Sequence, residues 1–366
     1  MNFNALKVVL VHDWLNGMRG GEKVLEQLCL LFPQAPIFSL HGELEKISDL
    51  IKKHPIHFSW IQKIPFKAQW YRYYLPLYPY AIRAFDFSGF DLVISTSHCA
   101  AKNVRVPASI PHICYCFSPM RYLWTLQDEY FGKNKFKKAL LYFPIKWLKQ
   151  WDRQGAKRVT HFLTISKTIQ ERIRQCYGLE AQLIYPPTEM SFMPQRPKKN
   201  YFLILSALVP YKRIDLAIRA SNQKQFPLKI AGSGPLLSEL KKIAGPQVEF
   251  LGWVSEEQKL ELLKNAQALI FPGLEDFGIV PLEAMSVATP IVGFGRGGLT
   301  ETVTHLHTGV FFQEQTVTSL ISAIQTLEQN DFPIENFRKT LERFAPEKFR
   351  SEFQRTVEEM GKTTPF

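Results

Sequence analysis

The sequence predicts an α/β protein with two domains, each built around a parallel β-sheet. Three observations carry this prediction. The chain has 366 residues, which is too long for one ordinary hydrophobic core. Short apolar runs alternate with helical patterns twice along it, as in successive strand–helix–strand units. A segment rich in proline and lysine, residues 186–199, separates the two series and is the best candidate for a linker.

The first series opens with an apolar run at residues 8–11, which predicts a buried strand. Gly17, Gly20 and Gly21 follow it, and a helical pattern begins at Glu22. Strand, glycine loop and helix form the opening of a nucleotide-binding fold, although these glycines do not match the strict dinucleotide fingerprint. Further elements of this series are strands at residues 91–95, 112–116 and 161–165, and a helix from Ser166 to Gly178.

The second series begins after the linker. Its expected strands lie at residues 201–206, 227–231, 248–253, 268–271 and 289–293. A helix with apolar positions four residues apart is expected after Pro346. The predicted organisation is therefore an N-terminal domain at residues 1–190, a C-terminal domain at 191–345, and a helix at 346–366 that packs back on the N-terminal domain. Ligands favour the cleft between two such domains.

Residues 275–283 are the most informative segment of the chain. Glu275 lies on the loop after a predicted strand, and Glu283 lies near the start of the following helix. Pro281 suits the first helical turn, because its missing N–H would be unpaired there. The backbone N–H groups near Gly278 and Ile279 then offer a phosphate site at the positive end of the helix dipole. Carboxylates accept hydrogen bonds from sugar hydroxyls, so the segment fits a ligand with phosphate and sugar side by side.

The composition restricts the class of protein. No run approaches eighteen uncharged apolar residues, so no transmembrane helix is expected. The N-terminus lacks a cleavable signal pattern. The five cysteines have neither zinc nor disulfide spacing, which favours the reducing cytoplasm. Residues 1–195 hold 25 Lys and Arg against 14 Asp and Glu, whereas the remainder is nearly neutral.

The basic half contains stretches in which Lys and Arg are mixed with aromatic residues, at 66–75, 133–138 and 146–151. Such stretches suit an anionic membrane surface, with rings at the headgroup level and cations near lipid phosphate. They equally fit solvated basic helices whose aromatic residues point into the core. No nucleic-acid-binding motif accompanies the charge, so nucleic acid is not expected as a partner.

Taken together, the motifs resemble those of family-four retaining glycosyltransferases of the GT-B fold, in particular bacterial surface-polysaccharide mannosyltransferases. The resemblance covers nearly the whole chain. The segments that carry it are residues 19–22, 118–124, 208–213, 231–235, 250–252, 275–283 and 297–303. It implies two facing Rossmann-like domains with a deep cleft between them.

The resemblance also implies donor-binding residues. Glu283 would accept both ribose hydroxyls of the donor nucleotide, and Glu275 would hold hydroxyls of the transferred sugar. Lys212 and Arg213 would neutralise the diphosphate, and with Glu275 they are the expected catalytic residues. The amides of residues 277–279, which are Phe277, Gly278 and Ile279, would face the sugar and diphosphate.

On the N-terminal domain, the resemblance places Gly20 and Gly21 over the diphosphate. Arg121 would meet the acceptor or its phosphate, with a buried ion pair as the other reading. Related sequences often have histidine before Ser118, where this chain has Phe117. A phenylalanine cannot hydrogen-bond a sugar hydroxyl, so another group must take over, the donor sugar must lack that hydroxyl, or activity is lost. His98 and His112 are the candidates for replacement.

Two further departures involve alanine. Ala207 stands where related sequences often have arginine, so Lys212 and Arg213 would contact the phosphates unaided. Ala288 replaces a common glycine after the second glutamate, which we interpret as a small change in packing.

The function implied is a retaining, metal-independent transferase without cofactor. It would move a sugar, best matched by mannose from GDP-mannose, to a lipid-linked or polysaccharide acceptor in O-antigen, lipopolysaccharide or capsule synthesis. The expected location is the cytoplasm, at the anionic surface of the inner membrane. A UDP-sugar-dependent transferase of the same fold remains an alternative, as does a nucleotide- or glycan-binding protein that has lost catalysis.

Overall fold

The computed structural model describes residues 6–65, 71–125, 127, 135–188, 191–194 and 200–363. The chain divides into two compact units. The first unit is Met1–Pro187 with Pro346–Phe366, and the second is Thr188–Ala345. Parts of the aromatic-basic stretches, residues 66–70 and 133–134, and of the expected linker, residues 195–199, lie outside the described residues.

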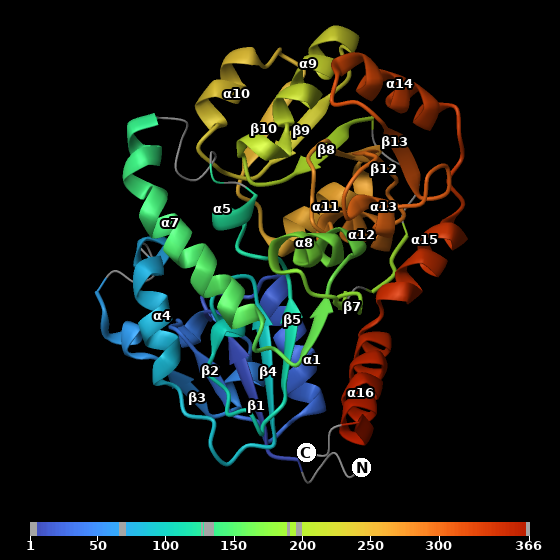
Figure 1. Cartoon of the computed structure of the whole chain (residues 1–366). Coiled ribbons are helices and arrows are strands. Elements are labelled where there is room, and N and C mark those ends of the chain that lie inside the picture. Colours follow the sequence, from blue (N-terminus) through green and yellow to red (C-terminus); the bar gives the residue numbers. More distant parts are fainter. Residues whose placement is uncertain are drawn as a thin grey trace. The chain divides into compact units, whose positions relative to one another are not determined.

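The first unit contains a parallel sheet of seven strands in the order β3-β2-β1-β4-β5-β6-β7 (Figure 1). The central strands β1, β4 and β5 are buried along their whole length, because helices cover both faces. The strand bounds are β1 Val8–His12, β2 Ile37–Ser39, β3 Ile56–Phe58, β4 Leu92–Ser97, β5 His112–Cys116, β6 His161–Thr164 and β7 Gln182–Leu183.

The helices around this sheet include α8, whose two ends are set by local sequence. In α8, Ser166 accepts a hydrogen bond from the N–H of Ile169, and Gly178 ends the helix at a φ of 70°. The α-helices are α1 Gly20–Leu31, α2 Asp49–Lys52, α4 Tyr78–Ala81, α5 Arg121–Trp124, α7 Lys135–Ala156, α8 Lys167–Tyr177 and α16 Pro346–Thr363. The 3₁₀ turns are η2 Leu44–Lys46, η3 Trp60–Lys63, η4 Tyr71–Leu77, η5 Ile82–Ala84 and η6 Ala101–Asn103.

The last helix, α16, packs on the first unit. Phe349, Phe353 and Val357 recur every four residues and are almost completely buried. The ring of Phe349 lies edge-on to that of Tyr115 in β5, with centroids 5.6 Å apart. Burial of one apolar stripe thus ties the end of the chain to the first sheet.

The second unit holds a parallel sheet of six strands in the order β10-β9-β8-β11-β12-β13. The strands are β8 Phe202–Leu205, β9 Leu228–Ala231, β10 Val248–Gly252, β11 Ala268–Phe271, β12 Ile291–Phe294 and β13 Gly309–Phe312. The helices are α9 Ile214–Lys224, α10 Leu237–Ile243, α11 Glu256–Asn265, α12 Ile279–Ser286, α13 Leu299–Thr302, α14 Val317–Glu328 and α15 Ile334–Leu341, with the 3₁₀ turns η7 Pro210–Lys212 and η8 Glu342–Phe344.

Both sheets have the strand order of a doubly wound nucleotide-binding fold. In each, the order reverses next to the first strand of the series, between β1 and β4 and between β8 and β11. Loops that leave adjacent strands in opposite directions open a crevice at such a point, where ligands bind. None of the described helices is both long and apolar enough to cross a membrane.

The interpretation of Ala288 as a packing change was wrong, because its backbone is left-handed with a φ of 54°. Ala288 follows the C-cap of α12, and its N–H donates to the carbonyl of Met285, while the N–H of Thr289 donates to that of Ala284. This pair of bonds is a Schellman motif, whose left-handed position favours glycine. Alanine at this position therefore adds backbone strain.

Ala288→Gly is expected to change the free energy of unfolding by less than about 0.5 kcal/mol, because relief of strain offsets the lost methyl burial and the added chain entropy. The same substitution at Ala323, a buried position inside α14, is expected to cost about 1 kcal/mol or more. Urea unfolding of both variants measures the difference, and equal costs would contradict the assigned strain.

Candidate active site

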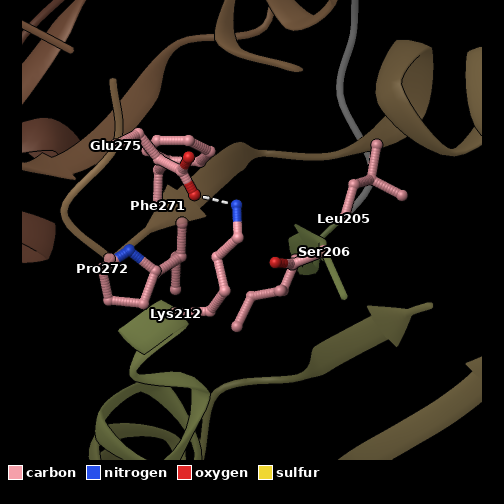
Figure 2. A pocket seen from close by; sticks show the side chains of 9 residues that line it. Leu205, Ser206, Lys212, Phe271, Pro272 and Glu275 are labelled. Atoms are coloured by element: carbon pink, nitrogen blue, oxygen red, sulfur yellow. Dashed lines mark hydrogen bonds and ion pairs between the residues drawn. The ribbon is translucent and has the colours of Figure 1, made fainter. Parts of the chain in front are cut away.

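The crevice of the second unit lies where β8 and β11 end. A pocket there is lined by residues 204–206 at the end of β8, residues 270–273 at the end of β11, and the side chains of Lys212 and Glu275 (Figure 2). Lys212 ends the turn η7, and Glu275 lies on the loop after β11. The strand reversal thus brings together two residues predicted from sequence.

Lys212 and Glu275 form an ion pair, with the ammonium Nζ hydrogen-bonded to Oε1 (Figure 2). Their side chains are 18% and 12% exposed. The Lys212 ammonium also lies 5.7 Å from the centre of the Phe271 ring. Since the pair is largely removed from water, each charge is more strongly felt than at an open surface.

Glycines allow three loops to approach closely enough to form this site. A Cβ on Gly273 would come within 2.9 Å of the Lys212 Cα, and one on Gly298 within 2.2 Å of the Asp276 carbonyl oxygen. Gly297, with a φ of 72°, packs against the carbonyl oxygen of Glu275 in the same way. The N–H of Gly298 donates to that carbonyl at 2.8 Å. Backbone-to-backbone packing therefore fixes the position of Glu275.

Helix α12 begins directly after this loop. Gly278 precedes it with a φ of 96°, a left-handed conformation that glycine adopts without strain. The Phe277 ring is buried against Phe344, with centroids 5.6 Å apart, so only its backbone faces the loop. Ile279 opens the helix with a side chain 37% exposed. Glu283 falls in the second turn of α12 rather than the first.

Glu283 is paired with a residue that the sequence analysis did not identify. Lys259 Nζ lies 2.8 Å from Glu283 Oε1 and 2.6 Å from Glu256 Oε2. Burial alone would lower the pKa of the Lys259 ammonium, but the two glutamates outweigh it and raise that pKa. Lys259 lies on α11, and the capping residue Ser255 marks the start of this helix in the sequence. Nothing in the sequence indicates that α11 contacts α12.

Arg213 has its own pair of contacts. Its Nη1 lies 3.3 Å from Gln315 Oε1, and its Nε lies 3.3 Å from Asp215 Oδ1. Gln315 in turn donates to the carbonyl of Pro272 at 2.8 Å. Arg213 is thereby connected to the loop that carries Glu275, although its side chain does not line the pocket.

The first unit has a second cluster at its own strand reversal. Asp13, at the end of β1, is fully buried and accepts hydrogen bonds from the N–H groups of residues 98–101 after β4. Burial alone would raise the pKa of Asp13, but His98 and these N–H groups outweigh it and lower that pKa. A charged Asp13 therefore holds the loop that carries His98.

His98 Nδ1 lies 3.2 Å from Asp13 Oδ2. A carboxylate only accepts hydrogen bonds, so Nδ1 carries the proton and Nε2 of the neutral ring is an acceptor. The Phe117 ring lies 6.5 Å from that of His98. Burial lowers the pKa of His98, and the nearby charges of His12 and Arg121 act in the same direction. A Cβ on Gly21 would come within 3.3 Å of the Phe117 ring. The predicted residues Gly20, Gly21, His98 and Arg121 thus share one edge of this sheet.

Glu22 adds a second carboxylate to this cluster. Its Oε1 lies 3.8 Å from His12 Nε2, and its Oε2 accepts from the N–H of Arg19 at 3.0 Å. Burial would raise the pKa of Glu22, but the hydrogen bond and charge of His12 outweigh it and lower that pKa. His12, Asp13 and Glu22 were not chosen as site residues from sequence. His12 and Asp13 were visible only as residues at the end of a predicted strand, whereas Glu22 lies in the segment 19–22 that carries part of the family resemblance.

The suggestion that His112 replaces the missing histidine was wrong. His112 begins β5, is 1% exposed, and has Nε2 2.7 Å from Ser95 Oγ in the neighbouring strand. Burial, with the nearby Arg158, lowers its pKa to about 3. It is a neutral core residue that no ligand can reach.

The described residues contain no group of three or more His, Cys, Asp or Glu side chains arranged to hold a metal ion. What the second unit offers instead is a pair of carboxylates that accept hydrogen bonds from hydroxyls, beside two cations that suit phosphate. These groups surround the start of α12, where the helix dipole favours negative charge.

Residues 188–348 match the family model described as glycosyl transferases group 1. This part of the chain is therefore similar to group 1 glycosyltransferases. The match coincides with the second unit, which holds Lys212, Glu275 and Glu283. The fold is GT-B, with two Rossmann-like units.

Two relatives show how the resemblance is distributed. The O-antigen chain mannosyltransferase RfbU of Salmonella typhimurium is 28% identical over 52% of this chain and 58% of its own length. The human alpha-1,3/1,6-mannosyltransferase ALG2 is 26% identical over 62% of this chain and 64% of its own length. In both cases the match spans somewhat less than two thirds of the relative.

Among solved structures, Anabaena Alr3699/HepE in complex with UDP is similar with a TM-score of 0.70 and 16% identity. The match covers 97% of this chain and 100% of that one. At this identity the similarity establishes the fold, and it does so for the whole chain rather than for the second unit alone.

Replacing His112 by Gln is expected to reduce the acid sensitivity of the folded protein. The unfolded imidazole has an ordinary pKa near 6.5 and the folded one about 3, so the unfolded state binds the extra proton between those values. Within that window, the free energy of unfolding therefore decreases by up to about 1.4 kcal/mol for each unit by which the pH is lowered. His112→Gln should remove that component, as measured by urea unfolding at a series of pH values. An unchanged pH slope would contradict the assignment.

Proposed function

We propose that this protein is a retaining, metal-independent glycosyltransferase that moves a sugar from a nucleotide donor to a lipid-linked or polysaccharide acceptor. The observation that carries the proposal is the arrangement around α12. Two glutamates, each paired with a lysine, flank the start of a helix at the strand reversal of the second unit. Such an arrangement provides hydroxyl acceptors and phosphate-binding cations on one ligand-binding edge.

The donor occupies these groups by exchanging their partners. The diphosphate takes Lys212 from Glu275, and the released Glu275 accepts hydrogen bonds from hydroxyls of the sugar. The ribose hydroxyls likewise replace Lys259 on Glu283, while Lys259 keeps its contact with Glu256. No charge is left buried without a partner during this exchange, which keeps the energetic cost of binding low.

Lys212 and Arg213 act in the chemical step. As the glycosidic bond breaks, the leaving nucleoside diphosphate gains negative charge, and a cation already in place stabilises that charge more than it stabilises the ground state. The amides of Phe277, Gly278 and Ile279 face the same charge. We nominate no protein nucleophile, and the donor phosphate accepts the proton of the attacking hydroxyl.

The acceptor meets the first unit. The Nε2 atom of His98 is the hydrogen-bond acceptor that Phe117 lacks, since Asp13 fixes the proton on Nδ1. Arg121 binds the acceptor or its phosphate, and Gly20 and Gly21 leave room for the donor diphosphate. A protein that binds donor without transfer is the rival reading, and it would release no free nucleotide when a correct acceptor is added.

GDP-mannose is our preferred donor, because the two relatives described above are named mannosyltransferases. The name of the Salmonella relative supports a place in O-antigen or related surface-glycan synthesis. We place this step at the cytoplasmic face of the inner membrane. A UDP-sugar donor is the alternative, favoured by the UDP in the complex of the structural neighbour.

Glu283→Gln is expected to weaken donor binding by about tenfold to a hundredfold, because hydrogen bonds to a charged acceptor contribute about 1.5–3 kcal/mol. Titration calorimetry with the donor nucleotide measures the change. Glu256→Gln is the matched control, since it removes the other partner of Lys259 but not the ribose contact. Equal affinities of wild type and Glu283→Gln would refute the assigned role.

Lys212→Met is expected to lower kcat by roughly 10²–10³, the usual effect of removing one donor that stabilises transition-state charge. Initial rates at saturating donor and acceptor measure it. Lys229→Met, which breaks a more exposed ion pair with Glu249 in the same sheet, should leave kcat unchanged. A similar small loss in both variants would show that Lys212 contributes to stability alone.

A further inference from the structure

Helix α7 of the first unit exposes large apolar side chains that the core of this unit does not cover. Leu140, Phe143 and Trp147 are 69%, 75% and 43% exposed. They recur at intervals of three and four residues, so they lie along one face of the helix. Single exposed apolar side chains are ordinary, but a continuous group of this size indicates an interaction site.

Two tyrosines extend this surface. Tyr80, in α4, is 59% exposed and stacks on Trp147 with ring centroids 6.5 Å apart and planes 28° apart. Tyr142 is 56% exposed on α7. The α7 face, as we define it, consists of Tyr80, Leu140, Tyr142, Phe143 and Trp147.

The structure divides the aromatic-basic stretches between core and surface. Leu148, which directly follows Trp147, and Trp151, one turn after it, are 4% and 6% exposed and belong to the core of the first unit. Figure 1 shows the course of α7. Tyr78, two residues before Tyr80, is likewise buried. The C-terminal part of α7 anchors the helix, and the preceding turns present the α7 face to the surroundings.

The charge next to the α7 face is positive. Between residues 140 and 156 the basic residues are Lys146, Lys149 and Arg153, and Asp152 is the one acid. Asp152 is fully buried and pairs with Lys102 at 2.6 Å, so it does not neutralise exposed Lys146 or half-buried Lys149. The Lys146 ammonium lies 6.0 Å from the centre of the Tyr142 ring. Cations and rings therefore alternate on the same surface.

We propose that the α7 face attaches the protein to a bilayer that contains anionic phospholipid. Tyrosine and tryptophan rings favour the headgroup level, phenylalanine and leucine enter the acyl boundary, and lysines pair with lipid phosphate. A second copy of the chain is a poorer partner, because a symmetric contact would place these lysines against each other. No donor or acceptor is involved, so this inference stands or falls independently of the proposed reaction.

The test is sedimentation of the full chain with vesicles of phosphatidylcholine mixed with phosphatidylglycerol, or of phosphatidylcholine alone. The wild type should bind the anionic vesicles, less so at high salt, and should bind the neutral ones weakly. The triple variant Leu140→Ser, Phe143→Ser, Trp147→Ser should partition at least about tenfold less. A double variant, Lys146→Glu with Lys149→Glu, should also partition at least about tenfold less, because it replaces two attractive charges near the anionic surface by repulsive ones.

Trp253→Ser is the matched control, because Trp253 is 78% exposed on the second unit and lies outside the α7 face. It should bind anionic vesicles as the wild type does. Brominated lipid should also quench part of the tryptophan fluorescence of the wild type. This quenching should be absent in Trp147→Phe. The proposal is overturned if the wild type ignores anionic vesicles or if the triple variant binds them equally. It is also overturned if the triple substitution dissolves a dimer without changing vesicle binding.

Discussion

Close contact between backbones is the constraint on which the donor site depends. Gly273 lets the loop after β11 lie against the turn at residues 210–212, and Gly297 and Gly298 lie directly on the backbone of Glu275 and Asp276. At these distances any side chain would force the loops apart. The main chain that carries Glu275 is therefore rigidly held, and the ion pair with Lys212 orients its carboxylate. Preorganisation of this kind is what charge stabilisation requires.

The two lysine–glutamate pairs are the chemical consequence of that framework. Glu275 and Glu283 each have a lysine beside them, so both carboxylates are neutralised before a ligand arrives. In the first unit the same solution appears in another form, where buried Asp13 is satisfied by backbone N–H groups and by His98. Strand reversal brings ionised groups together in both sheets, and each sheet supplies the partners that keep them charged.

Sequence patterns predicted most of the elements that bear the sites. The apolar run at residues 112–116 is β5, and the Ser166 and Gly178 signals bound α8, because caps and buried strands are local properties. The short strands β2, β3 and β7 escaped prediction, since two or three residues hold too little pattern, and the four-residue strand β13 was also missed. Lys259 and Asp13 could not be assigned, because their partners are set by the packing of elements distant in sequence. From the sequence, His112 could be considered a residue that contacts the sugar, because its burial becomes evident only in the structure.

The central claim is that the second unit binds a nucleotide sugar at the start of α12, between Glu275 and Glu283. Thermal unfolding of the protein with GDP, UDP, ADP and their common sugar conjugates tests it most directly, because a ligand that binds only the native state raises the unfolding temperature by mass action. We expect GDP and GDP-mannose to raise it, and a rise with UDP compounds instead would change the donor while keeping the site. No rise with any nucleotide would contradict the account.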